Sequence, residues 1–424
     1  MLNIQVNKSP YIKKIFSVLF CLIILFCVYL IIFQQTEPEK RVMLGNEIFI
    51  SKHMPEIKNK NLGLVVNHTS RLPNGNHLVD ALIENGASIK ALFSTEHGFL
   101  GIQEAGQLIE DSQYKGISIH SLHGRIKKPT LQQVKDIDAF IYDIQDVGAR
   151  FYTYITTMKY ILESAADENI PVYILDRPNP IGGQIIEGPI LDMKLQSFTA
   201  PCPIPIRYGM TCGELALMMK GEQWISENTD IRVIKMKAWK RHYFWEDTGF
   251  FWIPTSPNIP LSDTALAYPG TSLLGGIRVN HGIGTLNPFL QFGAPWLEPE
   301  IIIQNLGGQS NQGIKLSPIA YTPQSISGKT AYPPYKDRLC QGILISIEQK
   351  ENFHSVEFTL FLIKTLKNYY PDKIKIITNK LDSLYGNENL GLYVEGRISF
   401  EMMLNQMKKE EETFRQQRKK YLIY

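Results

Sequence analysis

The sequence contains few cysteines, 5 among 424 residues, and it lacks the spacings that bind zinc. Cys21 and Cys27 lie in an apolar N-terminal run, and the others are Cys202, Cys212 and Cys340. No two of them form a CxxC pair, so the pattern indicates neither a zinc site nor a disulfide framework. The sequence leaves a Cys202–Cys212 disulfide open, and we expect no metal ion.

The sequence also lacks a marked excess of charge. Its 44 Lys and Arg nearly balance 41 Asp and Glu, which leaves a net charge of +3. No long basic stripe with interleaved aromatic residues occurs, so the pattern argues against nucleic acid as a partner. With 44% hydrophobic and 20% charged residues, the composition is that of a globular protein long enough for two domains.

A charge-free apolar run covers residues 16–33. As a helix it would be about 27 Å long, enough to span the hydrocarbon core of a bilayer. Lys8, Lys13 and Lys14 precede it, so the positive-inside rule places the N-terminus in the cytoplasm and the body outside. A cleaved signal peptide is the alternative, but no pair of small residues marks a cleavage site. We predict that residues 1–41 form a cytoplasmic stub, a signal-anchor helix and a linker, which anchor the body at the inner membrane, on its extracytoplasmic side in the cell envelope.

Four short apolar runs each end in a dense polar cluster. The runs cover 62–66, 89–93, 139–142 and 172–175, and the clusters cover 67–70, 94–98, 143–150 and 176–180. Near-continuous apolar runs of this length are typical of strands buried on both faces of a parallel sheet. Helical patterns lie between them, so we expect an α/β fold in which the carboxyl ends of the strands share one edge. Ligands bind at that edge in open α/β sheets.

The remaining periodicities predict further elements and a second domain. We expect helices over 77–85, 131–135, 154–169, 213–221, 356–369 and 399–420, and strands over 117–119, 231–236, 342–347 and 373–377. Pro, Gly, Ser and Asn are frequent from about residue 251, where we expect loops. The parallel-sheet domain should therefore cover 42–256, and a smaller mixed α/β domain should cover 257–424.

The first polar cluster lacks the glycines of a nucleotide site. Asn67-His68-Thr69-Ser70 stands where a dinucleotide-binding sheet would carry GxGxxG. This absence argues against a nicotinamide-dependent oxidoreductase, and we expect no cofactor. Metal binding by His68 and His97 with acidic neighbours is an alternative, although hydrogen-bonded histidines without a metal are common in protein cores.

Glu96 is the sharpest catalytic candidate. It follows a predicted strand and precedes His97 and the flexible Gly98. A carboxylic acid in a partly apolar pocket, here beside Phe93 and Phe99, can have a pKa high enough to donate a proton at neutral pH. The alternative is that Glu96 caps the next helix.

The cluster at 143–150 offers two carboxylates, an amide and a guanidinium on one turn. Asp143, Asp146, Gln145 and Arg150 could bind sugar hydroxyls and supply a base, with Tyr152 available for stacking on a sugar. An internal Asp–Arg salt bridge is the alternative. Asp176, on the next strand end, is a second site carboxylate or a turn former.

At these residues the sequence resembles the exo-β-N-acetylmuramidase family. The similarity runs from about residue 42 to 424. It covers the motifs Asn67-His68-Thr69-Ser70, Glu96-His97-Gly98-Phe99, the segment 143–154, Asp176-Arg177-Pro178-Asn179-Pro180, Glu187-Gly188-Pro189, Ser256-Pro257-Asn258, Gly293-Ala294-Pro295-Trp296 and the closing segment 418–424. The resemblance implies a Rossmann-like domain and a smaller C-terminal domain with a cleft between them. It also implies release of terminal non-reducing N-acetylmuramic acid from peptidoglycan fragments, with Glu96 as the catalytic acid and His97 beside it.

The sequence departs from the family pattern at several positions. Leu100 and Ile283 stand where the family has Arg, Gly275 and Leu290 where it has Glu, and Tyr208 where it has His. Muramic acid carries a lactyl carboxylate, which a bidentate Arg recognises well. The sequence therefore leaves open which cation binds it: Arg150, Arg177, Arg207 or Arg278, of which Arg278 is the first to test.

These expectations define one leading hypothesis and one alternative. We expect a glycoside hydrolase in which Glu96 protonates the leaving oxygen and Asp143 or Asp146 activates water or stabilises the transition state. The predicted substrate-binding residues are Asn67, His68, Gln145, Arg150, Tyr152, Asp176, Arg177 and Arg278. The alternative is a catalytically weakened envelope protein that binds muropeptides.

Overall fold

The computed structural model describes residues 20, 41–306, 312–377 and 379–424. The predicted anchor, at residues 16–33, therefore lies outside the described residues except for residue 20. Within the described part, no helix combines the length and the apolar character that crossing a bilayer requires.

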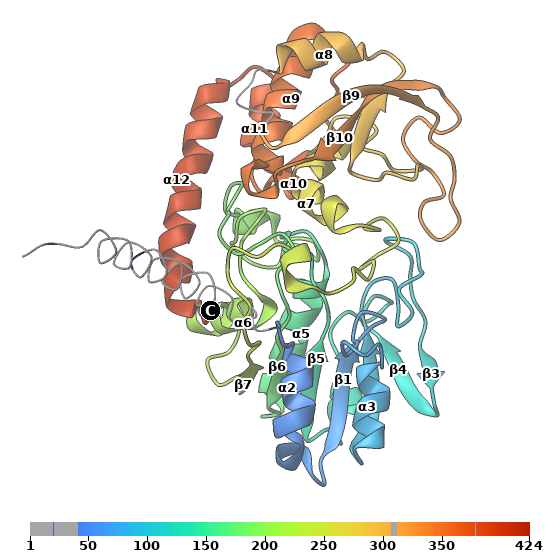
Figure 1. The fold of residues 1–424 in the computed structure, drawn as a ribbon, viewed down its shortest axis with the longest axis vertical. Coiled ribbons are helices and arrows are strands. Elements are labelled where there is room, and N and C mark those ends of the chain that lie inside the picture. Colours follow the sequence, from blue (N-terminus) through green and yellow to red (C-terminus); the bar gives the residue numbers. More distant parts are fainter. Residues whose placement is uncertain (1–19, 21–40, 307–311, 378) are drawn as a thin grey trace, which may run out of the picture. The chain divides into compact units, whose positions relative to one another are not determined.

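A seven-stranded sheet forms the frame of the first domain (Figure 1). Its order is β3 (Ser112–Tyr114), β4 (Ile117–Ser121), β2 (Ser88–Ser94), β1 (Asn61–Val66), β5 (Ala139–Asp143), β6 (Val172–Leu175) and β7 (Ile231–Ile234). Neighbouring strands are parallel, except that β3 pairs antiparallel with β4 at the edge. The predicted parallel α/β sheet is confirmed, and the carboxyl ends of its six parallel strands share one edge.

Helices cover both faces of this sheet, because successive strand residues point to opposite sides. Leu62, Leu64 and Val66 of β1 pack with α2 (Gly45–Lys52) and α3 (Leu78–Glu84). Val65 packs on the other face in the same core as α4 (Leu131–Val134), α5 (Tyr154–Asp167) and α6 (Cys212–Gly221). Burial on both faces is the reason why the strands read as continuous apolar runs.

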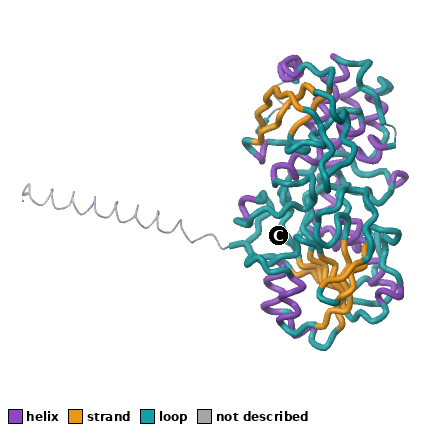
Figure 2. The backbone as a smooth tube through the Cα atoms, turned by 90° about the vertical axis from the view of Figure 1, so that its right-hand side faces the viewer, coloured by secondary structure: helices purple, strands orange, loops and turns teal. Residues whose placement is uncertain are grey.

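A second, three-stranded antiparallel sheet lies in the C-terminal half. Its order is β8 (Gln291–Ala294), β10 (Cys340–Ile347) and β9 (Ile314–Tyr321), with helices α8 (Pro299–Asn305) and α9 (Ser355–Tyr369) beside it. Figure 2 shows loops filling the space between the two sheets. Residues 42–424 form one compact unit. The described cysteines, Cys202, Cys212 and Cys340, are buried and free, so no Cys202–Cys212 disulfide is present.

The region after residue 251, where we expected loops, contains a helix that the sequence pattern did not predict. Helix α7 (Ser262–Thr271) is formed despite Pro269 near its end. A proline there loses only one late helical hydrogen bond, so it does not prevent the earlier turns. Gly270 allows α7 to touch α9, because a Cβ at this position would lie 1.8 Å from the carbonyl oxygen of Ser355.

The predicted strand at 373–377 is wrong. Residues 374–377 have no regular structure, and the backbone N–H of Ile377 donates a hydrogen bond of 2.8 Å to the carbonyl oxygen of Gly276, which belongs to no strand. Lysine and isoleucine alternate there as in a half-buried strand, but only Ile374 is buried and no neighbouring strand is available. The sheet instead uses β8 and β9, which the sequence did not predict.

The long helix predicted near the C-terminus is confirmed. With the helices before it, it connects the C-terminal half of the chain to the N-terminal half. After α10 (Lys380–Tyr385) and α11 (Asn389–Val394), helix α12 (Phe400–Arg418) runs back toward α6 (Figure 1). Arg418 donates to the carbonyl oxygens of Tyr208 and Gly209. The hydroxyl of the last residue, Tyr424, donates to Asp176 at 2.7 Å. The C-terminal segment therefore ties the second domain to the edge of the first sheet.

Candidate active site

A cavity of about 410 Å³ is lined by residues from both halves of the chain. We call it the Glu96 cavity. It is lined by Glu96, His97, Ala105, Phe151, Tyr152, Thr153, Thr199, Ser256, Asn258 and Ile259 from the first part of the chain, and by Tyr268, Ile283, Phe289, Lys380, Ser383 and Leu384 from the second. Its volume falls in the range of small-molecule sites, about 300–1,000 Å³. Aromatic walls with a few polar groups suit a carbohydrate ring.

Glu96 is the only carboxylate among the described residues that line this cavity. It follows β2, and its side chain is 12% exposed. One oxygen accepts a hydrogen bond of 2.6 Å from the Thr153 hydroxyl, and the other accepts one of 2.8 Å from the backbone N–H of Gly106. The Nε2 atom of His123 lies 3.5 Å from Glu96 Oε1. The carboxylate is therefore held in one orientation at the cavity wall.

The predicted raised pKa of Glu96 is wrong for the unliganded protein. Burial has the largest single effect and raises the pKa. The Thr153 hydroxyl, the nearby histidines and the Gly106 N–H together outweigh it, so the pKa lies below its usual value. The contacts that lower the pKa of Glu96 stabilise its charged form. The sequence could not reveal them, since Thr153 and His123 are distant from Glu96 in the chain.

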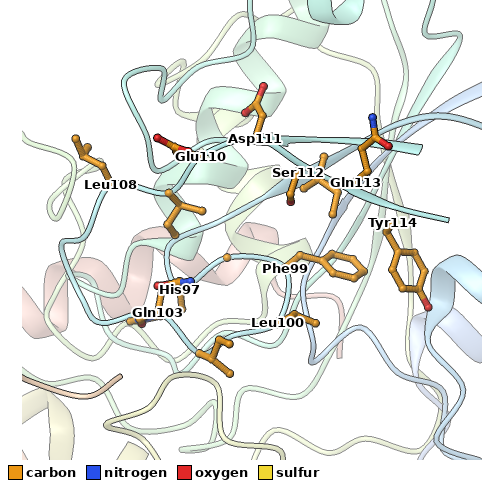
Figure 3. A pocket seen from close by; sticks show the side chains of 14 residues that line it. His97, Phe99, Leu100, Gln103, Leu108, Glu110, Asp111, Ser112, Gln113 and Tyr114 are labelled. Carbon is orange, nitrogen blue, oxygen red and sulfur yellow. The ribbon is translucent and has the colours of Figure 1, made fainter. Parts of the chain in front are cut away.

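His97 lies at the junction of two cavities. Its Nδ1 atom donates to the carbonyl oxygen of Gln103 at 2.7 Å, and burial lowers the pKa of the ring. Burial therefore favours the neutral imidazole, in which Nε2 is an acceptor. His97 lines both the Glu96 cavity and a second cavity of about 550 Å³, which is formed by residues 97–100, 102–103 and 108–114 with Ile119. Figure 3 shows this second cavity, with His97 and Gln103 at one end and Tyr114 at the other.

The structure places Asp143 away from the Glu96 cavity. Its side chain is fully buried and forms a two-point ion pair with Arg177, at 2.5 Å from Nε and 3.0 Å from Nη2. Asn46 donates to the same carboxylate at 3.1 Å. Asp143 thus forms an Asp–Arg salt bridge, but with Arg177 of the next strand end and not with Arg150 of its own turn, whose guanidinium donates to backbone carbonyl oxygens. This pair joins the ends of β5 and β6.

Asp146 is also buried outside the cavity lining. One oxygen accepts from the hydroxyl of Tyr208 and, at 2.7 Å, from the N–H of Gly148. Its Oδ1 atom is buried and has no hydrogen-bond partner among the described residues. Burial raises the pKa of this carboxyl to about 6.

Three predicted binding residues hold the loops at the strand ends. Asn67 Oδ1 accepts from the N–H of Thr69 at 2.9 Å. His68 Nε2 bonds the carbonyl oxygen of Pro254 at 2.6 Å, and Gln145 donates to two backbone oxygens. Each of these side chains thus bonds the protein's own backbone through one polar group, and none of the three lines the Glu96 cavity.

Asp176 belongs to the start of helix α6. It accepts hydrogen bonds of 2.7 Å from the Thr211 hydroxyl and 2.9 Å from the Gly213 N–H, in addition to that from Tyr424. Burial raises the pKa of its carboxyl to about 6. It is therefore an internal tie between the sheet, α6 and the C-terminus.

The four candidate arginines also lie outside the cavity lining. Arg150 is fully buried and donates to three backbone carbonyl oxygens, and Arg177 is paired with Asp143. Arg207 is buried against Glu187 at 3.1 Å. Arg278 is exposed, with a left-handed φ of 58°. None of them is positioned to meet a ligand bound beside Glu96.

The residues around the Glu96 cavity include some that the sequence motifs predicted and some that they did not. Glu96, His97 and Tyr152 were predicted and line the cavity. Thr153 was missed although it adjoins Tyr152, and His123 and Lys380 stand in no recognisable motif. No three His, Cys, Asp or Glu side chains in the described ranges converge to hold a metal ion.

Comparisons with known proteins agree over nearly the whole chain. Residues 62–263 match the model of the family described as "Exo-beta-N-acetylmuramidase NamZ, N-terminal", and residues 266–424 match "Exo-beta-N-acetylmuramidase NamZ, C-terminal". The chain is 36% identical over 394 residues to the peptidoglycan beta-N-acetylmuramidase NamZ of Bacillus subtilis (strain 168), covering 92% of this chain and 93% of that protein.

Two solved structures are also similar, both of DUF1343 family proteins from Bacteroides fragilis NCTC 9343. One has a TM-score of 0.84 and 33% identity, covering 91% of this chain and 100% of that chain. The other has a TM-score of 0.73 and 34% identity, covering 90% and 99%.

Proposed function

The chain belongs to the exo-β-N-acetylmuramidase family, and on this basis we propose that it releases terminal N-acetylmuramic acid from the non-reducing ends of peptidoglycan fragments. Membership makes the protein an enzyme, a glycoside hydrolase that acts on peptidoglycan. The observation that supports the specific reaction is the position of Glu96 as the one carboxylate in the described lining of an aromatic cavity.

We propose that Glu96 transfers the proton. When the bond between C1 and the glycosidic oxygen breaks, the carboxylic acid gives its proton to the leaving oxygen. Water then adds to C1 and returns a proton to Glu96. Because the free protein favours the carboxylate, Glu96 must gain its proton as substrate binds. A sugar that fills the cavity excludes water and increases burial, the effect that already raises the pKa of Glu96 most.

The proposal assigns no chemical step to Asp143 or Asp146. Asp143 is paired with Arg177, and Asp146 is not among the described residues that line the cavity. The substrate itself carries a 2-acetamido group beside C1. Its oxygen can stabilise the positive charge that develops at C1, as in glycosidases that use substrate assistance. This mechanism needs only one carboxylate of the protein at the scissile bond.

The direct test uses a chromogenic β-N-acetylmuramoside and a MurNAc-terminated disaccharide. The expected result is release of free N-acetylmuramic acid by the purified protein. If both ligands bind and neither is cleaved, the alternative of a muropeptide-binding protein is favoured. The departure at Ile283, which lines the cavity and carries no charge, motivates that alternative.

We also propose an envelope location for this enzyme. The support is the sequence alone, namely the uncharged run at 16–33 after three lysines. Membrane fractionation of the full chain, compared with a chain that begins at residue 42, tests it. Recovery of the full chain in the soluble fraction would contradict an uncleaved anchor.

A further inference from the structure

The Glu96 cavity contains one cation that no sequence motif indicated. Lys380, at the start of α10, lines the cavity together with Ser383 of the same helix. The residue is accessible to solvent, and no acidic side chain among the described residues forms an ion pair with its ammonium group. Its charge is available to a ligand.

N-acetylmuramic acid differs from N-acetylglucosamine by a lactyl ether on C3, which ends in a carboxylate. This negative charge leaves water when it enters the cavity. Because a carboxylate that leaves water needs a hydrogen-bonded counter-charge, a cation in the cavity would favour its binding. The arginines considered from the sequence do not supply it, since Arg150, Arg177 and Arg207 bond inside the protein and Arg278 lies outside the lining.

We propose that Lys380 binds the lactyl carboxylate and thereby selects muramic acid over glucosamine. This inference rests on the proposed function. The scissile bond is at C1 and the lactyl group is at C3, so the acid and the cation must approach different parts of the ring. The acid and the cation come from different parts of the fold. Glu96 follows β2 in the N-terminal half, and Lys380 belongs to α10 in the C-terminal half. Each domain would recognise one end of the sugar.

The test compares Lys380→Met, which keeps the length of the side chain and removes its charge, with the wild-type protein and Lys380→Arg. Lys375→Met is the matched control, because Lys375 is exposed in the same segment and does not line the cavity. The substrates are chromogenic β-N-acetylmuramoside and β-N-acetylglucosaminide. Binding of free N-acetylmuramic acid and N-acetylglucosamine is measured by calorimetry.

Lys380→Met is expected to lower kcat/KM for the muramoside about 10- to 100-fold, mainly through KM, because a charge-assisted hydrogen bond is lost. Activity on the glucosaminide, where measurable, should be unchanged, and Lys380→Arg should retain most of the preference. Equal losses for both substrates, or no loss for either, would overturn the assignment.

The two proposals can fail separately. If the wild-type protein cleaves no muramoside, the proposed hydrolase reaction fails. The calorimetric comparison still decides the role of Lys380, since it requires only that N-acetylmuramic acid bind and that Lys380→Met weaken this binding selectively. Undiminished binding of N-acetylmuramic acid to Lys380→Met would contradict the role of Lys380 whatever the activity.

Discussion

Glu96→Gln tests the central assignment with little change in shape. The substitution removes the transferable proton and keeps an oxygen that can accept from the Gly106 N–H. The Thr153 hydroxyl, which now donates to the carboxylate at 2.6 Å, can rotate and accept from the new amide. Both contacts can therefore persist, and the fold should be preserved.

The expected loss of turnover follows from the role of a positioned acid. General acid catalysis contributes about 10²- to 10⁴-fold, or about 3–5.5 kcal/mol of transition-state stabilisation. Two hydrogen bonds to a charged group become bonds to a neutral one, so the free energy of unfolding should fall by no more than about 1–3 kcal/mol. The loss of activity should thus be much larger than the loss of stability can explain.

The assay is the initial rate on the chromogenic muramoside at saturating substrate, with thermal unfolding measured on the same samples. Glu104→Gln is a matched control, because Glu104 lies on the same loop and accepts from the Ala331 N–H at 2.8 Å, but does not line the cavity. Turnover by Glu96→Gln within about threefold of wild type would refute the assignment of Glu96 as the acid.

Three further predictions follow from the same contacts. Proton NMR of the first sugar released should show retention of the β configuration, and inversion would exclude assistance by the acetamido group. Because the pKa of Glu96 lies below the usual glutamate value of 4.5, little of the free enzyme is protonated, and kcat/KM should fall as pH rises through this acid range. Thr153→Val removes a donor that stabilises the carboxylate, so it should move the fall in kcat/KM to higher pH. An unchanged pH profile of Thr153→Val would contradict the role of Thr153 in lowering the pKa. Asp143→Asn should lower the free energy of unfolding by about 3–5 kcal/mol in denaturant titrations, because it leaves the buried Arg177 without its counter-charge, while kcat per folded molecule stays near wild type.

The lowered pKa of Glu96 also has a consequence for stability. A carboxyl whose pKa is lower in the folded than in the unfolded protein stabilises the fold at pH values above its unfolded pKa. This contribution is lost as pH falls through the folded pKa. The difference in unfolding free energy between the wild type and Glu96→Gln should therefore shrink toward the acid end of a pH series.

The parallel sheet could be predicted from sequence because burial on both faces leaves a direct trace. Strands such as 62–66 and 139–142 are apolar throughout, and no other short element has that pattern. The second sheet left no such trace. Strand β9 is half-exposed and contains Pro318, whereas the alternating segment at 373–377 resembles a strand but has no partner. Pairing depends on distant segments, and local periodicity does not report it.

The candidate site shows the same limit in its side chains. Polar residues cluster at the carboxyl ends of the strands both to bind ligands and to satisfy the loops that turn there. Asp143 and Glu96 look alike in sequence, yet Asp143 is enclosed by Arg177 and Asn46 and Glu96 faces a cavity. The motif containing Glu96 was sufficient to predict the carboxylate that lines the cavity. It could not identify Thr153, His123 or Lys380, because their roles depend on where the fold places them.

Carboxylates near the edge of the first sheet differ in whether they are bound inside the protein or face the Glu96 cavity. Asp143, Asp176 and Glu187 are each buried with donors that occupy them, so they cannot compete for a ligand. Glu96 also has donors, but Thr153 lines the cavity and Gly106 belongs to the loop that precedes β3. A ligand that enters can therefore exclude water from Glu96 and alter its surroundings without breaking the pairs that hold the sheet. We infer that charged groups have two separate roles in this fold. Buried carboxylates with fixed partners hold the loops in place, and Glu96 can change its protonation state during the reaction.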